Sequence, residues 1–137
     1  MKIREVMTPA PVAVLSTDTA TTAAMVMKEQ DIGAVLVTSD GRLEGILTDR
    51  DIAVRVLAAG FDPSATLVGD VCSRHLATVG LDDATDDAVR LMRQRAVRRV
   101  PVTDGGAPVG IVSIGDLALS RDQESALADI SLAPPNG

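Results

Sequence analysis

Aromatic residues are almost absent from this chain of 137 residues: Phe61 is the only one, and there is no Trp or Tyr. Basic residues are outnumbered as well, because 13 Lys and Arg face 19 Asp and Glu, which leaves a formal net charge of −6. Nucleic-acid binding usually depends on a basic surplus and on aromatic stacking platforms. The chain has neither, so we expect no nucleic-acid partner.

Cysteine and long apolar runs are scarce too. The single cysteine, Cys72, excludes a disulfide within the chain and fits the reducing cytoplasm, where we expect the protein to act. Cys72 and His75 have the spacing of half a metal site, but no other His or Cys exists to complete it. We therefore expect no metal and interpret Cys72 as a small core residue, while a bond through Cys72 between two subunits stays open. No apolar run approaches the roughly 18 residues of a membrane span, so we expect no membrane partner.

Motifs for catalysis are missing as well. Acyl transfer needs a nucleophile with a positioned base, and His75 is the only histidine. Neither a Gly-x-Ser-x-Gly elbow nor a phosphate-binding loop occurs. We therefore expect no catalytic residues, no enzymatic activity and no obligatory cofactor.

An internal repeat dominates what is present. A shift of 65 residues aligns the chain with itself without a gap. The matched pairs include Val6 with Val71, Val14 with Val79, Met27 with Met92, Val37 with Val102, Gly45 with Gly110, Ile46 with Ile111 and Asp51 with Asp116. Units of this size seldom bury enough core alone, so the two copies are expected to pack sheet against sheet with pseudo-twofold symmetry and a cleft between them.

Apolar periodicity and turn residues predict the same elements in each copy, which makes the fold mixed α+β. The first copy is expected to contain strands at 12–15, 34–38 and 43–47 and helices from 17 or 18 to 30 and at 49–59. The second is expected to contain strands at 78–79, 99–103 and 109–112 and helices at 82–95 and 114–120. We assign residues 1–60 to repeat 1, 61–67 to a linker, 68–122 to repeat 2 and 123–137 to a tail that is expected to be partly disordered.

A shared motif stands in each copy where a strand leads into a helix. The two sequences are Gly45-Ile46-Leu47-Thr48-Asp49-Arg50-Asp51 and Gly110-Ile111-Val112-Ser113-Ile114-Gly115-Asp116. A Ser or Thr followed three residues later by an acid is typical of a helix capping box. The same groups suit a nucleotide, because the hydroxyl can donate to a phosphate and the carboxylate can accept from a ribose diol. The two readings are compatible, and the motif alone does not choose between them.

Taken together, a duplicated strand–helix–hairpin unit with a Gly-h-h-[Ser/Thr]-x-x-Asp junction resembles a tandem CBS-domain pair, over about residues 2–122. The segment Val97-Arg98-Arg99-Val100-Pro101-Val102 matches the family's second-strand pattern. The run from Thr48 to Ile52 with that from Leu57 to Pro63 resembles small stand-alone actinobacterial proteins of the hypoxia- and stress-response type. The resemblance implies βαββα-type repeats, a flat homodimer, and sensing of AMP, ADP or ATP in the clefts.

The family's ligand-binding positions are carried over residue by residue. Thr48 and Asp51 match the ribose-phosphate residues of one cleft, and Ser113 and Asp116 match those of the other. The remaining implied contacts are Ile46, Ile111 and Val100 around the adenine, Ala13 and Thr78 from the first strands, and Arg98 and Arg99 toward the phosphate. Copy one has Gly33 and Ala34 where copy two has the two arginines, so we predict that the Ser113/Asp116 site binds more tightly. Ordinary exposed strand-edge charge is the competing explanation for these arginines.

The predicted helix at 49–59 points to a partner, because it is apolar almost all the way round. A homodimer through this helix would cover its second face. Our leading hypothesis is therefore a cytoplasmic, homodimeric, non-catalytic sensor that binds an adenine nucleotide and regulates another, unidentified protein. The alternative is a stress-induced dimeric interaction module whose clefts are vestigial and bind no nucleotide.

Overall fold

The protein divides into two compact units in the computed structural model, which describes residues 1–74 and 76–121. The first-repeat unit is Val12–Leu76. The second-repeat unit combines Met1–Pro11 with the described residues from Ala77 to 121. The tail expected at 123–137 lies outside the described residues.

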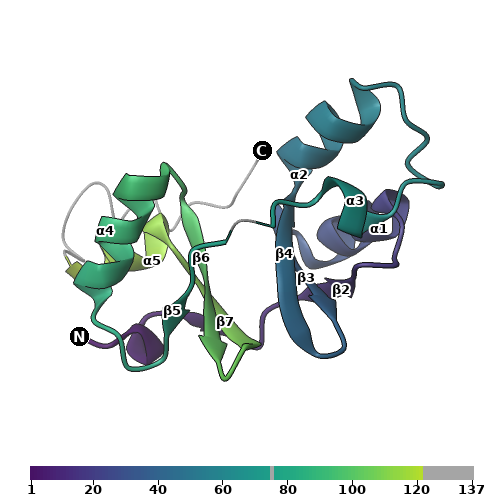
Figure 1. The fold of residues 1–137 in the computed structure, drawn as a ribbon. Coiled ribbons are helices and arrows are strands. Elements are labelled where there is room, and N and C mark those ends of the chain that lie inside the picture. The colour runs from purple at the N-terminus through teal and green to yellow at the C-terminus, as the bar shows by residue number, and fades with distance from the viewer. Residues whose placement is uncertain (75, 122–137) are drawn as a thin grey trace. The chain divides into compact units, whose positions relative to one another are not determined.

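A three-stranded sheet of order β2-β3-β4 forms the first-repeat unit (Figure 1). Its strands are β2 (Ala13–Leu15), parallel to β3 (Ala34–Ser39), which pairs antiparallel with β4 (Arg42–Thr48). Asp40 and Gly41 close the β3–β4 hairpin with φ of 52° and 77°, the left-handed conformations that such tight turns require. The predicted hairpin is thus confirmed, with each strand slightly longer than expected.

Helices cover one face of this sheet. They are α1 (Ala20–Gln30), α2 (Asp49–Asp51), which continues as the π-helix η2 (Ile52–Leu57), and α3 (Val68–Val71). Their core residues include Ala23, Met27, Val56 and Val68, which pack with Val35, Val37 and Leu47 of the sheet. The start expected at residue 17 or 18 is wrong, because Thr19 caps α1 by accepting from the backbone N–H of Thr22 at 3.2 Å. The single helix expected at 49–59 changes its winding after Asp51.

The second-repeat unit repeats this plan with one more strand, in the order β1-β7-β6-β5. Its elements are η1 (Ile3–Glu5), β1 (Thr8–Pro9), β5 (Val79–Gly80), α4 (Thr85–Arg95), β6 (Arg99–Asp104), β7 (Ala107–Ser113) and α5 (Ile114–Arg121). Strand β5 is parallel to β6, and β7 is antiparallel to both β6 and β1. Helix α4 begins at Thr85 rather than at the expected residue 82. The mixed α and β composition of both units confirms the predicted fold class.

Each unit also contains the leading segment of the other copy. Ile3 of η1 is fully buried in the core of the second-repeat unit, although it opens the first copy. Likewise α3, which opens the second copy, packs in the first-repeat unit through Val68 and Val71. The compact units therefore exchange segments relative to the copies in the sequence. Among helices of the described residues, none is long and apolar enough to cross a membrane.

Candidate functional site

The two strand–helix junctions have the same hydrogen-bond geometry. Thr48 Oγ1 accepts from the backbone N–H of Asp51 at 3.1 Å, and Asp51 Oδ2 accepts from that of Thr48 at 2.9 Å. Ser113 and Asp116 repeat both bonds at 3.1 and 2.9 Å. The predicted capping boxes are therefore confirmed. Each hydroxyl keeps its proton and each carboxylate keeps its Oδ1 outside the box, so capping leaves a donor and an acceptor at each junction.

The glycine that opens each motif is required by a neighbouring segment. An added Cβ at Gly45 would lie 2.7 Å from the Sγ of Cys72 and from the carbonyl oxygen of Ser73. At Gly110 it would lie 2.5 Å from the Sδ of Met7 and 3.0 Å from the carbonyl oxygen of Thr8. The absence of a side chain thus lets a leading segment lie against the strand that carries the junction.

In the first-repeat unit, the expected contact residues share one sheet face. Ala13 of β2 pairs with Leu36, which pairs in turn with Ile46 of β4. Thr48 follows Ile46 by two residues, so the two side chains leave the strand on the same side. Ala13 is exposed, and Ile46 and Thr48 are half-buried. The structure therefore brings Ala13, Ile46 and Thr48 to one face of this sheet, with Asp51 hydrogen-bonded to Thr48 where β4 ends.

The second-repeat unit places most of the matching residues in the same way. Ile111 and Ser113 are both half-buried and stand two residues apart on β7, so their side chains lie on the same face. Thr78 is exposed immediately before β5. Val100 differs from the expectation, because its side chain is fully buried in the core cluster with Val112. The side chain of Val100 therefore faces the core of this unit and not the sheet face that carries Ile111 and Ser113.

The basic residues make the two junctions unequal. Arg99 pairs across the β6–β7 ladder with Ser113, whereas Ala34 stands opposite Thr48 in the first-repeat unit. Directly opposite residues on one sheet face have their Cβ atoms only about 5 Å apart. The carbonyl oxygen of Arg98 accepts a hydrogen bond from the N–H of Ile114 at 2.9 Å. The side chains of Arg98 and Arg99 are both exposed. Arg99 is therefore the one of the pair that stands directly beside a junction hydroxyl.

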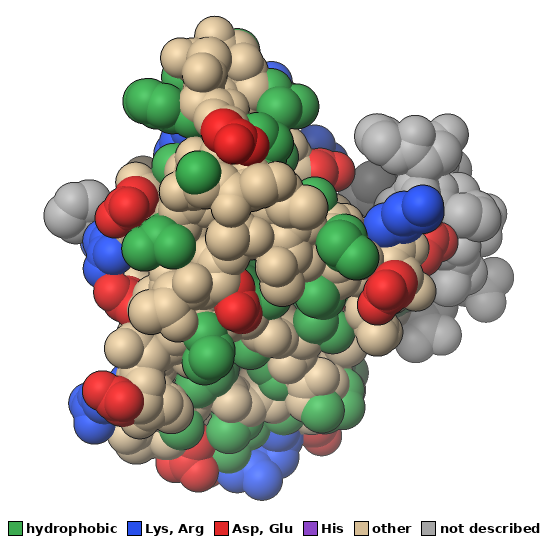
Figure 2. Space-filling model, turned by 90° about the vertical axis from the view of Figure 1, so that its right-hand side faces the viewer, with side chains coloured by type: hydrophobic (Ala, Val, Ile, Leu, Met, Phe, Trp, Pro, Cys, Tyr) green, Lys and Arg blue, Asp and Glu red, His purple; other side chains and the backbone are tan. Residues whose placement is uncertain are grey.

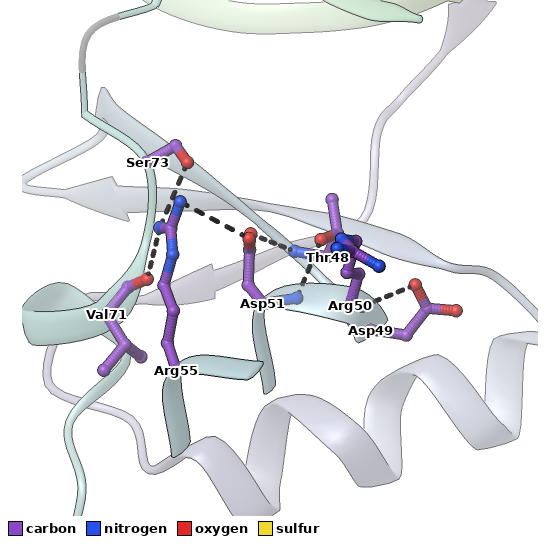
Figure 3. Close-up of polar contacts among 7 residues, drawn as sticks. All are labelled: Thr48, Asp49, Arg50, Asp51, Arg55, Val71 and Ser73. Atoms are coloured by element: carbon purple, nitrogen blue, oxygen red, sulfur yellow. Dashed lines mark hydrogen bonds and ion pairs between the residues drawn. The ribbon is translucent and has the colours of Figure 1, made fainter. Parts of the chain in front are cut away.

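A further arginine, which the sequence reasoning did not single out, lies at the first junction (Figure 3). The Nη2 of Arg55 lies 3.6 Å from the Oδ1 of Asp51. Its Nη1 donates to the carbonyl oxygen of Val71 at 2.9 Å and to the Oγ of Ser73 at 3.2 Å. The spacing of four residues between an acid and an arginine on a helix was the available signal.

Cys72 and Arg74 follow in the same segment. Cys72 is 9% exposed and belongs to the core cluster, which confirms its predicted structural role. Burial raises the pKa of the Cys72 thiol, and the nearby charge of Arg74 partly opposes that shift. Arg74 donates to Glu44 and to the carbonyl oxygen of Gly69, and the hydrogen bond and charge of Glu44 raise the pKa of Arg74. Among the described residues, which leave out His75, no three His, Cys, Asp or Glu side chains form a group that could hold a metal.

Comparison with known proteins identifies this duplicated unit. The family model of the CBS domain matches residues 3–58 and again residues 68–121. The chain belongs to the CBS-domain family. It is 39% identical over 133 residues to the CBS domain-containing protein YhcV of Bacillus subtilis, with 94% of each chain covered. It is 38% identical over 116 residues to Hypoxic response protein 1 of Mycobacterium tuberculosis, which covers 84% of this chain and 81% of that protein.

Solved structures agree with this assignment. A crystal structure of Hypoxic Response Protein I with two coordinated zinc ions matches this CBS pair with a TM-score of 0.80 at 37% identity, over 86% of this chain and 97% of that one. A protein with CBS domains from Burkholderia ambifaria matches with a TM-score of 0.82 at 29% identity, over 91% of this chain and 96% of that one. The resemblance of this sequence to stand-alone CBS pairs of the hypoxia-response type is thereby confirmed.

Proposed function

We propose that this CBS pair is a non-catalytic cytoplasmic sensor that binds an adenine nucleotide and passes the signal to another protein. Asp51 or Asp116 would accept hydrogen bonds from the ribose diol, and Thr48 or Ser113 would donate to the phosphate. The observation that carries the proposal is the paired geometry of the two junctions. Each holds a hydroxyl and a carboxylate in fixed positions at the start of a helix, and the hydroxyl proton and one carboxylate oxygen take no part in the capping box.

The surroundings of each junction suit the rest of such a ligand. Ile46 and Ile111 lie two residues before the hydroxyls on the same side of their strands, so an adenine would meet aliphatic side chains there. With no Trp or Tyr in the chain, adenine recognition depends on such contacts rather than on aromatic stacking. Arg99 beside Ser113 adds a positive charge near the phosphate position, which favours the second repeat as the tighter site.

Asp-to-Asn substitutions test the proposal without removing the helix cap, because the Asn side-chain oxygen still accepts the backbone hydrogen bond. Calorimetric titration with AMP, ADP and ATP is carried out on the unmodified chain, Asp51→Asn, Asp116→Asn and the double variant. We expect Asp116→Asn to cause the larger loss, about tenfold or more, and the double variant to show no measurable binding. Asp104→Asn, an exposed acid at the end of β6, is the matched control.

Two outcomes contradict the proposal. Absence of binding by any of the three nucleotides at millimolar concentration supports the alternative, a dimeric interaction module with vestigial clefts. Binding that survives in the double variant places the nucleotide elsewhere. Unfolding of each variant is followed by circular dichroism, so that loss of fold is not mistaken for loss of binding.

Our proposed assembly is a homodimer formed through the helices of the first-repeat unit. Several large apolar side chains are more than half exposed there, namely Met25, Val54, Leu57 and Phe61. Between α1 and η2 lies an open hollow of about 280 Å³ lined by Ala20, Thr21, Ala24, Met25, Lys28, Ile52, Leu57 and Pro63. Hydrophobic side chains reach the surface at several places on this side of the molecule (Figure 2). Exposed apolar surface of this kind favours a protein partner, and a second copy can cover it symmetrically.

A further inference from the structure

Arg55 occupies the first junction from within the same unit. Three groups hold its guanidinium: the Asp51 carboxylate at 3.6 Å, the Val71 carbonyl oxygen at 2.9 Å and the Ser73 hydroxyl at 3.2 Å. Figure 3 shows the arginine between the junction helix and the segment that follows α3. A guanidinium has a rigid, planar set of donors, so several anchors at once fix its position. Arg55 is therefore a fixed neighbour of Asp51 and not a freely moving surface side chain.

The carboxylate that Arg55 faces is the one proposed to hold a ribose. Asp51 Oδ2 already accepts from the backbone N–H of Thr48, and Arg55 stands against Oδ1, the oxygen that the capping box leaves free. The Asp51 side chain is only 15% exposed, so water screens this pair less than it screens a surface ion pair. A diol that approaches Asp51 must share Oδ1 with the guanidinium or displace it from three partners.

The second junction has a different residue at the matching position. Ser120 takes the place of Arg55, and its hydroxyl donates to the carbonyl oxygen of Leu117 at 2.9 Å. Asp116 bonds within its capping box, and among the described side chains no basic group pairs with it. The two repeats thus present the same capping box with a cation on one acid and none on the other.

We propose that Arg55 is a specificity-determining residue that weakens ribose binding at Asp51 and so directs an adenine nucleoside or nucleotide to Asp116 first. This inference rests on the proposed function of the junctions. The effect proposed for Arg55 differs from that proposed for Arg99, which would strengthen binding at the second site through the phosphate. Arg55 acts on the first site through the diol, so a ligand without a phosphate separates the two effects.

Adenosine is therefore the probe, titrated calorimetrically against the full chain. All variants carry Asp116→Asn, so that binding reports on the first junction. We expect Arg55→Gln to tighten adenosine binding by roughly 3- to 10-fold, since one partly buried ion pair is released. Arg50→Gln is the matched control, because it removes the same charge from the same helix without touching Asp51, and it should leave affinity unchanged. Arg55→Lys keeps the charge and should keep binding weak.

A second set of controls separates charge from packing. Ser73→Ala removes one of the three partners of Arg55 but leaves the ion pair, so adenosine affinity should rise by less than in Arg55→Gln. Hydrogen–deuterium exchange gives a readout without ligand: the Ser73 amide, which donates to the Ile46 carbonyl at 2.9 Å, should exchange faster in Arg55→Gln. Unchanged exchange there shows that the anchoring by Arg55 is absent and overturns the inference.

The binding outcomes distinguish this inference from the proposed function. If the chain with Asp116 intact binds adenosine or AMP but Arg55→Gln gives no gain at the first junction, the inference on Arg55 is overturned and the proposed function stands. If Arg55→Gln weakens AMP binding and leaves adenosine unchanged, Arg55 is a phosphate contact, and the inference is again overturned. If no variant binds adenosine or AMP, both fail.

Discussion

Gly45 and Cys72 are packed so closely that a side chain at position 45 would collide with the thiol. A Cβ there would lie 2.7 Å from the Cys72 Sγ, and the Ser73 carbonyl oxygen would stand at the same distance on rigid backbone. Ser73 is held in place because its N–H and carbonyl exchange hydrogen bonds with Ile46 at 2.9 and 3.0 Å. The first residue of the motif therefore serves packing, while Thr48 and Asp51 are the motif residues that we propose for the ligand.

This contact predicts that Gly45→Ala destabilises the protein. The strand or the segment after α3 must shift to admit the methyl group, and overpacking of this kind typically costs about 1–3 kcal/mol. Gly110→Ala should cost less, because the nearest atom there belongs to the flexible side chain of Met7. Urea unfolding measures both values. Gly80→Ala is the control with ordinary contacts of 3.6 Å or more, and a cost for Gly45→Ala no greater than for this control would contradict the packing argument.

The sequence allowed both junctions to be predicted, because strands, turns and helix caps depend on local residue patterns and these patterns recur at an offset of 65 residues. It did not allow the exchange of leading segments to be predicted. Met7 and Cys72 match each other in the repeat, but periodicity is the same whether Cys72 packs on Gly45 or on Gly110. Only tertiary packing decides between these two arrangements.

The helix after the first junction shows a second limit. Its apolar residues predicted a helix, but the N–H of Ala58 bonds to the carbonyl of Ala53, five residues back, and this π-winding leaves no mark in the hydrophobic pattern. Val100 shows a third limit, since an alternating strand has two faces and the pattern did not say which one faces the core. Arg55 could have been found from its spacing to Asp51, although its anchors at Val71 and Ser73 come from distant sequence.

The buried Cys72 thiol predicts a loss of stability at alkaline pH. Burial raises its pKa in the folded state, so the unfolded chain loses this proton first as the pH rises. The stability that the buried neutral thiol contributes is therefore fully present below the unfolded thiol pKa of about 8.5, and it is lost as the pH rises through the higher folded pKa. Urea unfolding of the unmodified chain and of Cys72→Ala between pH 7 and 10 should show a steeper decline for the unmodified chain. Parallel pH profiles would refute the role of this thiol.

The proposed homodimer predicts that Leu57→Glu yields a monomer. Leu57 is 58% exposed, so the substitution removes little core packing, but it places a charge in the apolar surface beside Met25. Light scattering after size exclusion at about 50 μM should show the mass of one chain instead of two. Val97→Glu, an apolar residue of the second-repeat unit that is 39% exposed, is the control and should stay dimeric. A monomeric unmodified chain, or a Leu57→Glu variant that remains dimeric, contradicts this interface.

The pairing of Arg99 with Ser113 predicts a phosphate-dependent effect on nucleotide affinity. Replacing Arg99 with Gln removes the charge opposite the hydroxyl but leaves both capping-box bonds intact. AMP affinity at the second junction should fall by roughly 5- to 20-fold, as expected for the loss of a charge-assisted contact, while adenosine affinity should hardly change. The titrations use the Asp51→Asn background, so that the first junction does not contribute. Arg93→Gln, in the last turn of α4, is the control for net charge. Arg99 is ordinary strand-edge charge if Arg99→Gln lowers the affinities for AMP and adenosine equally, or if it lowers neither affinity. The greater affinity proposed for the second repeat would then need another cause.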